Sequence, residues 1–366
     1  MESLLEETSV IIVTYNHKKY IEDCINSICS KDKLELIIVD NNSTDGTADL
    51  IEELYPGVKL IRNSENTGFS KGVNLGVKNS NRKYVVILNP DTRFKENSIE
   101  ELLKPLKEIK NIITVPKALL FDGSAINTCG NINHFTGLAF TRGLGDDISK
   151  FNQTECIKGL SGVCFAMERK CYWKIGGFDE NYFLYMEDTD ISWKIHTNGC
   201  KMLYIPNAVI YHDYVLQVPP EKIYHVERGR YIILKKYLTW REYLLLAPSL
   251  IMTEIFTWGY SILNGFSGIK YKSKAVKDGL TLDVKKVPSD KYKLLNSLEG
   301  QIPRQFGHNI LGWLVTVIGN FIYHANLMIA LKLMGWRLPE TDISKIQYMK
   351  NANVIIESDN RKSEAK

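Results

Sequence analysis

The first part of the chain alternates between short apolar runs and longer stretches in which apolar residues recur about every three or four positions. The apolar runs predict strands at residues 9–13, 34–39, 58–61 and 84–88. The periodic stretches predict helices at residues 18–28, at 47–54 and in a segment that ends at Val77. Strands that alternate with helices in this way are typical of a parallel sheet with right-handed crossovers, so we expect an α/β fold.

Polar residues follow three of these predicted strands directly. They are Thr14, Tyr15 and Asn16 after the first strand, Asp40 after the second, and Asp91 after the fourth. Each group alone is also typical of a simple turn or a helix cap. Because the carboxyl ends of parallel strands share one edge of the sheet, and open α/β sheets bind ligands there, the three groups together favour a pocket at that edge.

After residue 112 the pattern changes to shorter segments. Residues 112–145 are rich in Gly and Asn and predict an antiparallel excursion beside the pocket. The remaining pattern predicts a strand at 159–167, a loop at 173–180, a helix at 191–197 and a strand at 204–212.

The densest acidic group of the chain, Glu187-Asp188-Thr189-Asp190, precedes the predicted helix at 191–197. One interpretation is an N-cap and an acidic first turn, which the helix dipole favours. The other, which we favour for Asp188, is a general base held near a pocket. His212 ends the last predicted strand, where a structural role and a metal or phosphate role are both open.

The last third of the chain predicts long helices. Two largely apolar runs, 244–266 and 310–336, reach the length of a membrane span only by tolerating polar residues. They fit attachment to a membrane surface, or a helical subdomain that packs on the core or on a second copy in a homo-oligomer. We therefore predict a catalytic domain at 1–220, a helical, membrane-proximal extension at 221–340 and a polar tail at 341–366, with disorder over 358–366.

Composition narrows these expectations only a little. Hydrophobic residues make up 44% and charged residues 24%, which argues against wholesale disorder. The net charge of +4 comes without a long basic run, so we expect no nucleic-acid partner. The 7 cysteines contain no C-x-x-C pair. The acidic start of the chain runs straight into a predicted strand, so we expect no signal peptide. A cytoplasmic, reducing location is the simplest expectation.

Five segments in a fixed order carry a family resemblance. They are V-I-I-V-T-Y-N, V-D-N-N-S-T-D-G-T, N-T-G-F-S-K-G-V-N, L-N-P-D-T and G-G-F-D-E-N-Y-F-L-Y-M-E-D-T-D-I-S-W-K, with His212 after the last. Over residues 8–215 the chain thus resembles family 2 glycosyltransferases of the inverting GT-A type, which implies a Rossmann-like, mostly parallel nucleotide-sugar-binding sheet.

The resemblance also implies roles for individual residues. The nucleotide contacts would be Thr14, Tyr15, Asn16, Asp40, Asn66, Lys71 and Asp91. A solvated Lys71 is the alternative to a phosphate contact. Asp91 corresponds to the metal-binding aspartate of the D-x-D-type motif, with Asn89 at the first acidic position, as in members similar to rhamnosyl- and galactofuranosyltransferases. His212 then becomes a plausible supplementary ligand.

The implied chemistry needs these residue types. A divalent cation, Mg²⁺ or Mn²⁺, held by Asp91 and His212 would stabilise the charge on a diphosphate leaving group. Asp188 would be the general base that deprotonates the acceptor hydroxyl, with Glu187 beside it to orient the acceptor or a loop. Displacement in a single step would invert the anomeric carbon.

The sequence therefore predicts an inverting glycosyltransferase with a nucleoside-diphosphate sugar donor, UDP- or dTDP-linked, and a glycan or lipid-linked acceptor. We expect it in cell-surface polysaccharide or glycoconjugate synthesis, peripheral or monotopic on the cytoplasmic face of the cell membrane. One rival is a sugar nucleotidylyltransferase, which usually has a glycine-rich phosphate loop where this chain has Thr-Tyr-Asn-His. The other is a non-catalytic nucleotide- or glycan-binding scaffold, which would not need Asp91, Asp188 and His212 together.

Overall fold

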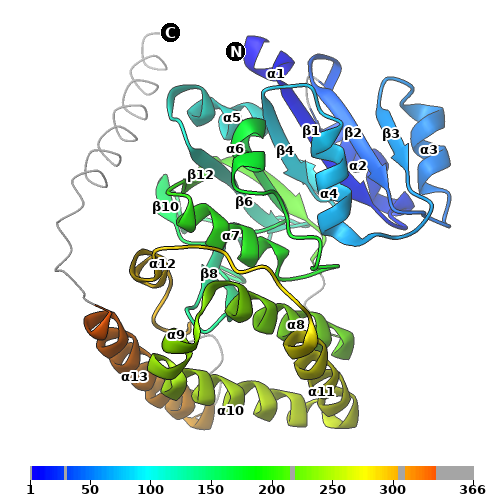
Figure 1. Ribbon diagram of the computed structural model, residues 1–366. Helices are drawn as coiled ribbons and strands as arrows, with labels where there is room; N and C mark the ends of the chain where they lie inside the picture. Colours follow the sequence, from blue (N-terminus) through cyan, green and yellow to red (C-terminus); the bar gives the residue numbers. More distant parts are fainter. Residues whose placement is uncertain (1, 29–30, 215–218, 304–309, 335–366) are drawn as a thin grey trace.

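A large twisted sheet forms the upper part of the molecule (Figure 1). The computed structural model describes residues 2–28, 31–214, 219–303 and 310–334. The ten strands are β1 (Thr8–Thr14), β2 (Glu35–Asp40), β3 (Lys59–Arg62), β4 (Tyr84–Leu88), β5 (Thr92–Phe94), β6 (Ile112–Leu120), β7 (Ile126–Thr128), β10 (Glu155–Ile157), β11 (Cys164–Glu168) and β12 (Lys201–His212). The path through the sheet is β10-β12-β6-β11-β4-β1-β2-β3, with β5 on β12 and β7 on β6.

The first four strands of that sheet are parallel, as the alternating pattern predicts. Their continuous apolar runs follow from burial on both faces, because successive side chains point to opposite sides of a strand. In β1, Val10 and Ile12 join the core beneath α2 (Lys18–Ser27) and α5 (Ser98–Glu108), whereas Ile11 and Val13 join the core beneath α4 (Gly68–Lys78).

The middle of the chain differs from the sequence expectation in several elements. Only part of 112–145 is an excursion, because β6 lies inside the main sheet, parallel to β12 and antiparallel to β11. The ribbon of β8 (Asn131–Asn133) and β9 (Ala139–Thr141) is the separate antiparallel pair. Pro116 is tolerated in β6 because it lies opposite Ile205, where the register of β12 shifts.

Three elements also have other boundaries in the structure than the sequence predicts. The strand expected at 159–167 begins at Cys164, and the loop expected at 173–180 starts inside α6 (Arg169–Lys174). The helix expected at 191–197 is α7 (Glu187–Thr197), so the acidic group forms its first turn instead of preceding it. Carboxylates in a first turn are favoured by the helix dipole, which explains why the helix extends to them.

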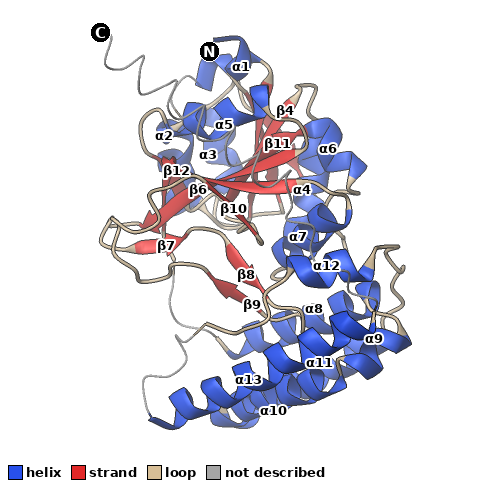
Figure 2. Cartoon of the chain, turned by 90° about the vertical axis from the view of Figure 1, so that its left-hand side faces the viewer, coloured by secondary structure: helices blue, strands red, loops and turns tan. Residues whose placement is uncertain are grey.

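Two further helices, α1 (Glu2–Glu6) and α3 (Thr47–Leu54), lie beside the sheet (Figure 1). The helices after residue 219 lie beneath the sheet, with the β8–β9 ribbon between the two parts (Figure 2). They are α8 (Pro220–Tyr237), α9 (Trp240–Leu245), α10 (Ala247–Leu263), α11 (Gly265–Thr281), α12 (Lys291–Ser297) and α13 (Ile310–Leu333). Their core includes Phe135 and Trp193, which come from before residue 220, so packing crosses the predicted domain boundary. That boundary stays a prediction, and the tail predicted at 341–366 lies outside the described residues.

Charges are buried inside this helical part. Arg230 of α8 lies 2.9 Å from Glu227 and also contacts Glu254 of α10, while Lys272 of α11 contacts both carboxylates. Two cations and two anions balance, as burial of ions requires. Among the described residues, no helix combines the length and the apolar character that a membrane crossing needs.

Candidate active site

Asp91 and His212 meet at the carboxyl edge of the sheet. β5 follows Asp91 directly and pairs with the end of β12, where Thr92 lies opposite His212. This pairing places the His212 Nε2 atom 3.5 Å from the Asp91 Oδ1 atom. That oxygen is buried and has no hydrogen-bond partner among the described residues. An unsatisfied buried carboxylate oxygen is a group that a bound cation would satisfy.

The second ring nitrogen of His212 is held by a neighbouring side chain. The Nδ1 atom lies 2.9 Å from the Oδ1 atom of Asn127, a buried residue of β7. Because an amide oxygen only accepts hydrogen bonds, Nδ1 carries a proton, and Nε2 is the ring nitrogen that faces Asp91 and that a bound cation could share with it. Metal-binding histidines are oriented in this way by the partner of their other nitrogen.

His17 is a third residue at this point, which the sequence reasoning missed. Burial raises the pKa of Asp91, but the neighbouring His212 and His17 outweigh it and hold that pKa below its usual value. Burial lowers the pKa of His17, although the negative charges of Asp91 and Asp45 act to raise it. No three His, Cys, Asp or Glu side chains of the described part form a metal-binding group, so Asp91 and His212 would leave most of a cation's shell to phosphate and water.

The loops after β1 and β2 are tied together beside this point. Thr14 lies opposite Asp40 in the register, and Asp40 Oδ2 accepts a hydrogen bond of 2.9 Å from the backbone N–H of Ser43. The side chain of Asn16 accepts a bond of 2.8 Å from the Thr44 backbone. Asp40 and Asn16 therefore form turns, and their nucleotide contacts stay predictions. Tyr15 is 44% exposed, and Thr14 Oγ1 is buried without a partner among the described residues.

Asn66 and Lys71 lie in a separate polar cavity of about 400 Å³. Asn66 Oδ1 accepts a bond of 3.0 Å from the Gly68 backbone at the start of α4. The cavity is also lined by Glu180, His225 and Arg228. Within the described ranges, no hydrogen bond or ion pair joins Lys71 to Asp91, so its phosphate contact also stays a prediction.

The acid pair of α7 is the second half of the site. The chain enters α7 through Tyr185 and Met186, which have φ angles of 64° and 72°. Two successive non-glycine residues in the left-handed region store backbone strain of a kind found at functional sites. Asp188 Oδ2 accepts bonds of 2.8 Å from Asn131 Nδ2 and 3.4 Å from the Gly162 backbone.

Burial raises the pKa of both carboxyl groups. Burial, and then the charge of Asp188, raise the pKa of Glu187 to about 8. Burial also raises the pKa of Asp188, although hydrogen bonds from Gly162, Thr189 and Asn131 act to lower it. Because donated hydrogen bonds favour the ionised form, Asp188 is the carboxylate of the pair and Glu187 keeps the proton at neutral pH. A buried carboxylate with a raised pKa suits a general base.

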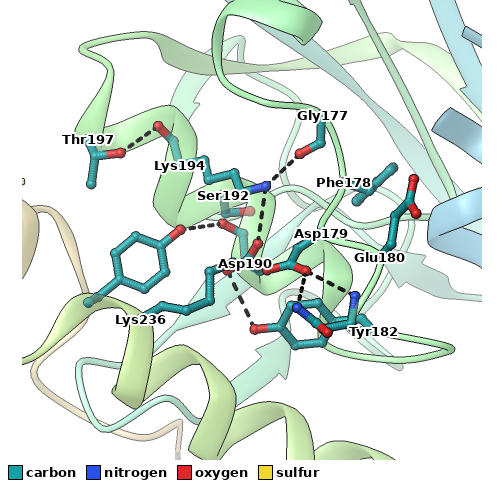
Figure 3. A network of polar contacts seen from close by, with 12 residues as sticks. Gly177, Phe178, Asp179, Glu180, Tyr182, Asp190, Ser192, Lys194, Thr197 and Lys236 are labelled. Carbon is teal, nitrogen blue, oxygen red and sulfur yellow. Dashed lines mark hydrogen bonds and ion pairs between the residues drawn. The ribbon is translucent and has the colours of Figure 1, made fainter. Parts of the chain in front are cut away.

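The last acidic residue of the group, Asp190, is paired with a lysine. Asp190 is fully buried, and its carboxylate lies 2.5 Å from the Nζ atom of Lys236 at the end of α8 (Figure 3). Lys236 also lies 2.6 Å from Asp179, and Lys194 of α7 donates a 2.8 Å bond to the Gly177 carbonyl. The sequence did not predict a role for Lys236, because its partners Asp190 and Asp179 lie 46 and 57 residues earlier in the chain.

Comparison with solved structures identifies the fold. GalNAc-T7, crystallised with UDP, GalNAc and Mn²⁺, aligns with a TM-score of 0.55 at 20% identity over 68% of this chain and 51% of that one. Residues 1–349 of S. aureus TarS align with a TM-score of 0.51 at 17% identity over 90% of this chain and 92% of that one. The sheet, with its acidic edge, defines a GT-A glycosyltransferase fold, which confirms the predicted fold class.

Sequence comparison adds the family. Residues 9–176 match the family described as Glycosyl transferase family 2. One similar protein is N-acetylglucosaminyl-diphospho-decaprenol L-rhamnosyltransferase of Mycobacterium tuberculosis. It is 25% identical to this chain over 229 residues, which cover 56% of this chain and 75% of that protein. Poly-beta-1,6-N-acetyl-D-glucosamine synthase of Staphylococcus aureus is 26% identical over 213 residues, 56% of this chain and 49% of that protein. These matches identify residues 9–176 as a glycosyltransferase family 2 region of the chain.

Proposed function

We propose that this glycosyltransferase moves a sugar from a nucleoside diphosphate to an acceptor hydroxyl with inversion, using Asp91, His212 and the Glu187–Asp188 pair. The observation that carries the proposal is the short segment between Asn127, which orients His212, and Asn131, which holds Asp188. Four residue steps span at most about 14 Å, so the two halves of the site lie within reach of one bound donor.

The chain's residues divide the reaction between them. Mg²⁺ or Mn²⁺ at Asp91 and His212 would stabilise the charge on the departing diphosphate. Asp188 takes the proton of the acceptor hydroxyl. At the same time the hydroxyl oxygen bonds to the anomeric carbon, and the bond between that carbon and the diphosphate breaks. Asn131 and the Gly162 backbone hold that carboxylate in place. Attack from the side opposite the leaving group inverts the anomeric carbon.

The names of the similar proteins support particular substrates. Structures of GalNAc-T7 and S. aureus TarS hold UDP, which supports a UDP-linked donor, with dTDP as the alternative. One relative is named for a diphospho-decaprenol acceptor and another for a polysaccharide product. A glycan or lipid-linked acceptor in cell-surface polysaccharide or glycoconjugate synthesis follows as our proposal, and turnover would separate the enzyme from a non-catalytic scaffold.

The proposed location is the cytoplasmic face of the cell membrane, as a peripheral or monotopic protein. α10 and α13 expose an apolar face formed by Ile251, Ile255, Ile262, Leu263, Ile318, Phe321, Ile329 and Leu333. The exposed Trp240 and the neighbouring Arg241 of α9 supply the aromatic and basic residues typical of an interfacial helix. A contact between two copies of the chain is the alternative use of this face.

Calorimetric titration of UDP, dTDP and GDP, each with Mn²⁺ and with chelator, tests the donor half. We expect one nucleotide to bind, and Asp91→Ala to weaken it at least about tenfold with Mn²⁺ but not with chelator, because metal-mediated contacts need the metal. Asp122→Ala removes a carboxylate from an exposed turn and serves as the matched control. Equal weakening by Asp91→Ala in chelator would contradict the metal role.

A further inference from the structure

An apolar cavity of about 560 Å³ lies between the β8–β9 ribbon and the helical part. Its walls include Phe140 of β9, Ile223 and Val226 of α8, and Ile255 and Phe256 of α10. This volume is within the usual range of ligand pockets, roughly 300–1,000 Å³. A wall of carbon atoms recognises a hydrocarbon ligand by burial of its surface.

Two charged side chains line the cavity, and they differ in their partners. Glu227 is buried and bound by Arg230 and Lys272, so its charge is already compensated. Lys222 has no ion pair among the described residues. Its Nζ atom lies 4.8 Å from the ring centre of Tyr185 and 5.8 Å from that of Tyr214. Lys222 is therefore a cation available to an anionic group.

The aromatic partners of Lys222 lead to both halves of the proposed active site. Tyr185 lies two residues before Glu187, and the charge of Glu187 contributes, after burial and Tyr214, to the raised pKa of Tyr185. The ring centre of Tyr214 lies 5.9 Å from that of His212. Lys222 consequently stands between the apolar cavity and the site of transfer.

We infer that the cavity binds the hydrocarbon chain of a phosphate-linked lipid acceptor, whose phosphate lies against Lys222 and whose sugar extends toward Asp188. The order of the protein groups, from carbon wall to cation to general base, matches the order of chain, phosphate and hydroxyl in such an acceptor. The inference rests on the proposed transfer to a lipid-linked acceptor and adds the place where the lipid binds.

Gly259 allows the cavity to be filled selectively. It lines the cavity from α10, and a Cβ atom built on it meets no atom within 4 Å. Leucine also favours a helix more than glycine does. Gly259→Leu should therefore fold normally and occupy the space of the ligand chain. Gly57→Leu is the matched control, because a Cβ atom at the exposed Gly57 also meets no atom within 4 Å.

The probes are farnesyl diphosphate, farnesol and inorganic diphosphate, each titrated into the full chain. We expect farnesyl diphosphate to bind more tightly than inorganic diphosphate. Each methylene excluded from the cavity weakens binding about fourfold, so Gly259→Leu should raise the dissociation constants of both isoprenoids tenfold or more. Lys222→Met should weaken farnesyl diphosphate about tenfold and leave farnesol unchanged, with recovery in Lys222→Arg.

Other results would overturn the inference. Farnesyl diphosphate binding that survives Gly259→Leu, or that falls equally in Gly57→Leu, would place the hydrocarbon chain outside the cavity. Absence of binding to the unaltered protein would also reject the cavity. UDP binding with Mn²⁺ is measured on every variant. A variant that keeps UDP binding and loses isoprenoid binding tests the cavity alone. If the unaltered protein does not bind UDP, the proposed donor site is rejected instead.

Discussion

The sheet part and the helical part of this glycosyltransferase distribute apolar and charged residues in opposite ways. In the sheet part, apolar side chains fill a core on each face of the strands, and exposed large ones such as Leu54 and Ile148 are scattered. In the helical part, Arg230 and Lys272 are almost fully buried, while Phe321 is 75% and Leu263 is 87% exposed. Large apolar patches at a surface are typical of contacts with a partner or a membrane, which agrees with the location that we propose for this protein.

The buried charges add specificity to the helical part more than they add stability. Removing charges from water costs about as much as their mutual attraction returns, whereas removal of one partner leaves an uncompensated buried ion. Arg230, Glu254 and Lys272 come from three helices, so their balance holds only when α8, α10 and α11 pack in one arrangement. Residues of α8 and α10 also line the apolar cavity.

The largest effect should come from the sheet part alone. Asp188→Asn removes the proposed base but no donor contact, so the turnover rate should fall by about 10³, within the usual range for a general base. Nucleotide binding should change little. Initial rates and calorimetry on the same preparation check both statements. Transfer at a near-normal rate in Asp188→Asn would show that another group takes the proton.

Glu187→Gln is the companion variant, and it has a pH signature. The folded-state pKa of Glu187 is raised to about 8, so the folded protein holds a proton that the unfolded chain has lost. The resulting stabilisation is present at low pH and disappears as pH rises through about 8. Thermal unfolding from pH 5 to 9 should show this loss in the unaltered protein and a smaller loss in Glu187→Gln.

The sequence predicts local elements and edge positions better than it predicts partners. The parallel strands, Asp91 beyond β4 and His212 at the end of β12 follow from local patterns, and the structure brings Asp91 and His212 together. Asn127 and Asn131 could not be assigned, because their partners lie 85 and 57 residues away and only the topology joins them. α11 lies inside the predicted helical extension, but its bounds were not predicted, because its buried residues are three small residues and a lysine and form no apolar pattern.

The next largest effect should come from the contact between the two parts. Lys236→Met leaves Asp190 and Asp179 without their ammonium partner, and loss of one member of a buried pair costs about 3 kcal/mol. Urea unfolding should show that loss of stability. If α8 positions α7, turnover should also fall with nucleotide binding retained, and Lys236→Arg should recover part of it. Lys235→Met, which loses bonds only to the Leu280 and Leu282 carbonyls, is the control.

The smallest effect tests the exposed face directly. Phe321→Glu places a charge on the apolar face of α13, and it should leave folding within about 0.5 kcal/mol because the side chain is 75% exposed. If the face enters a lipid surface, flotation with anionic vesicles should fall about tenfold, since burial of a phenylalanine contributes roughly 1.5–3 kcal/mol. Leu54→Glu makes the same change at a 45% exposed apolar residue of the sheet part and should leave flotation unchanged. Equal loss in both variants would mean that charge alone controls binding, and conversion of a dimer to a monomer by Phe321→Glu would assign the face to a second copy of the chain.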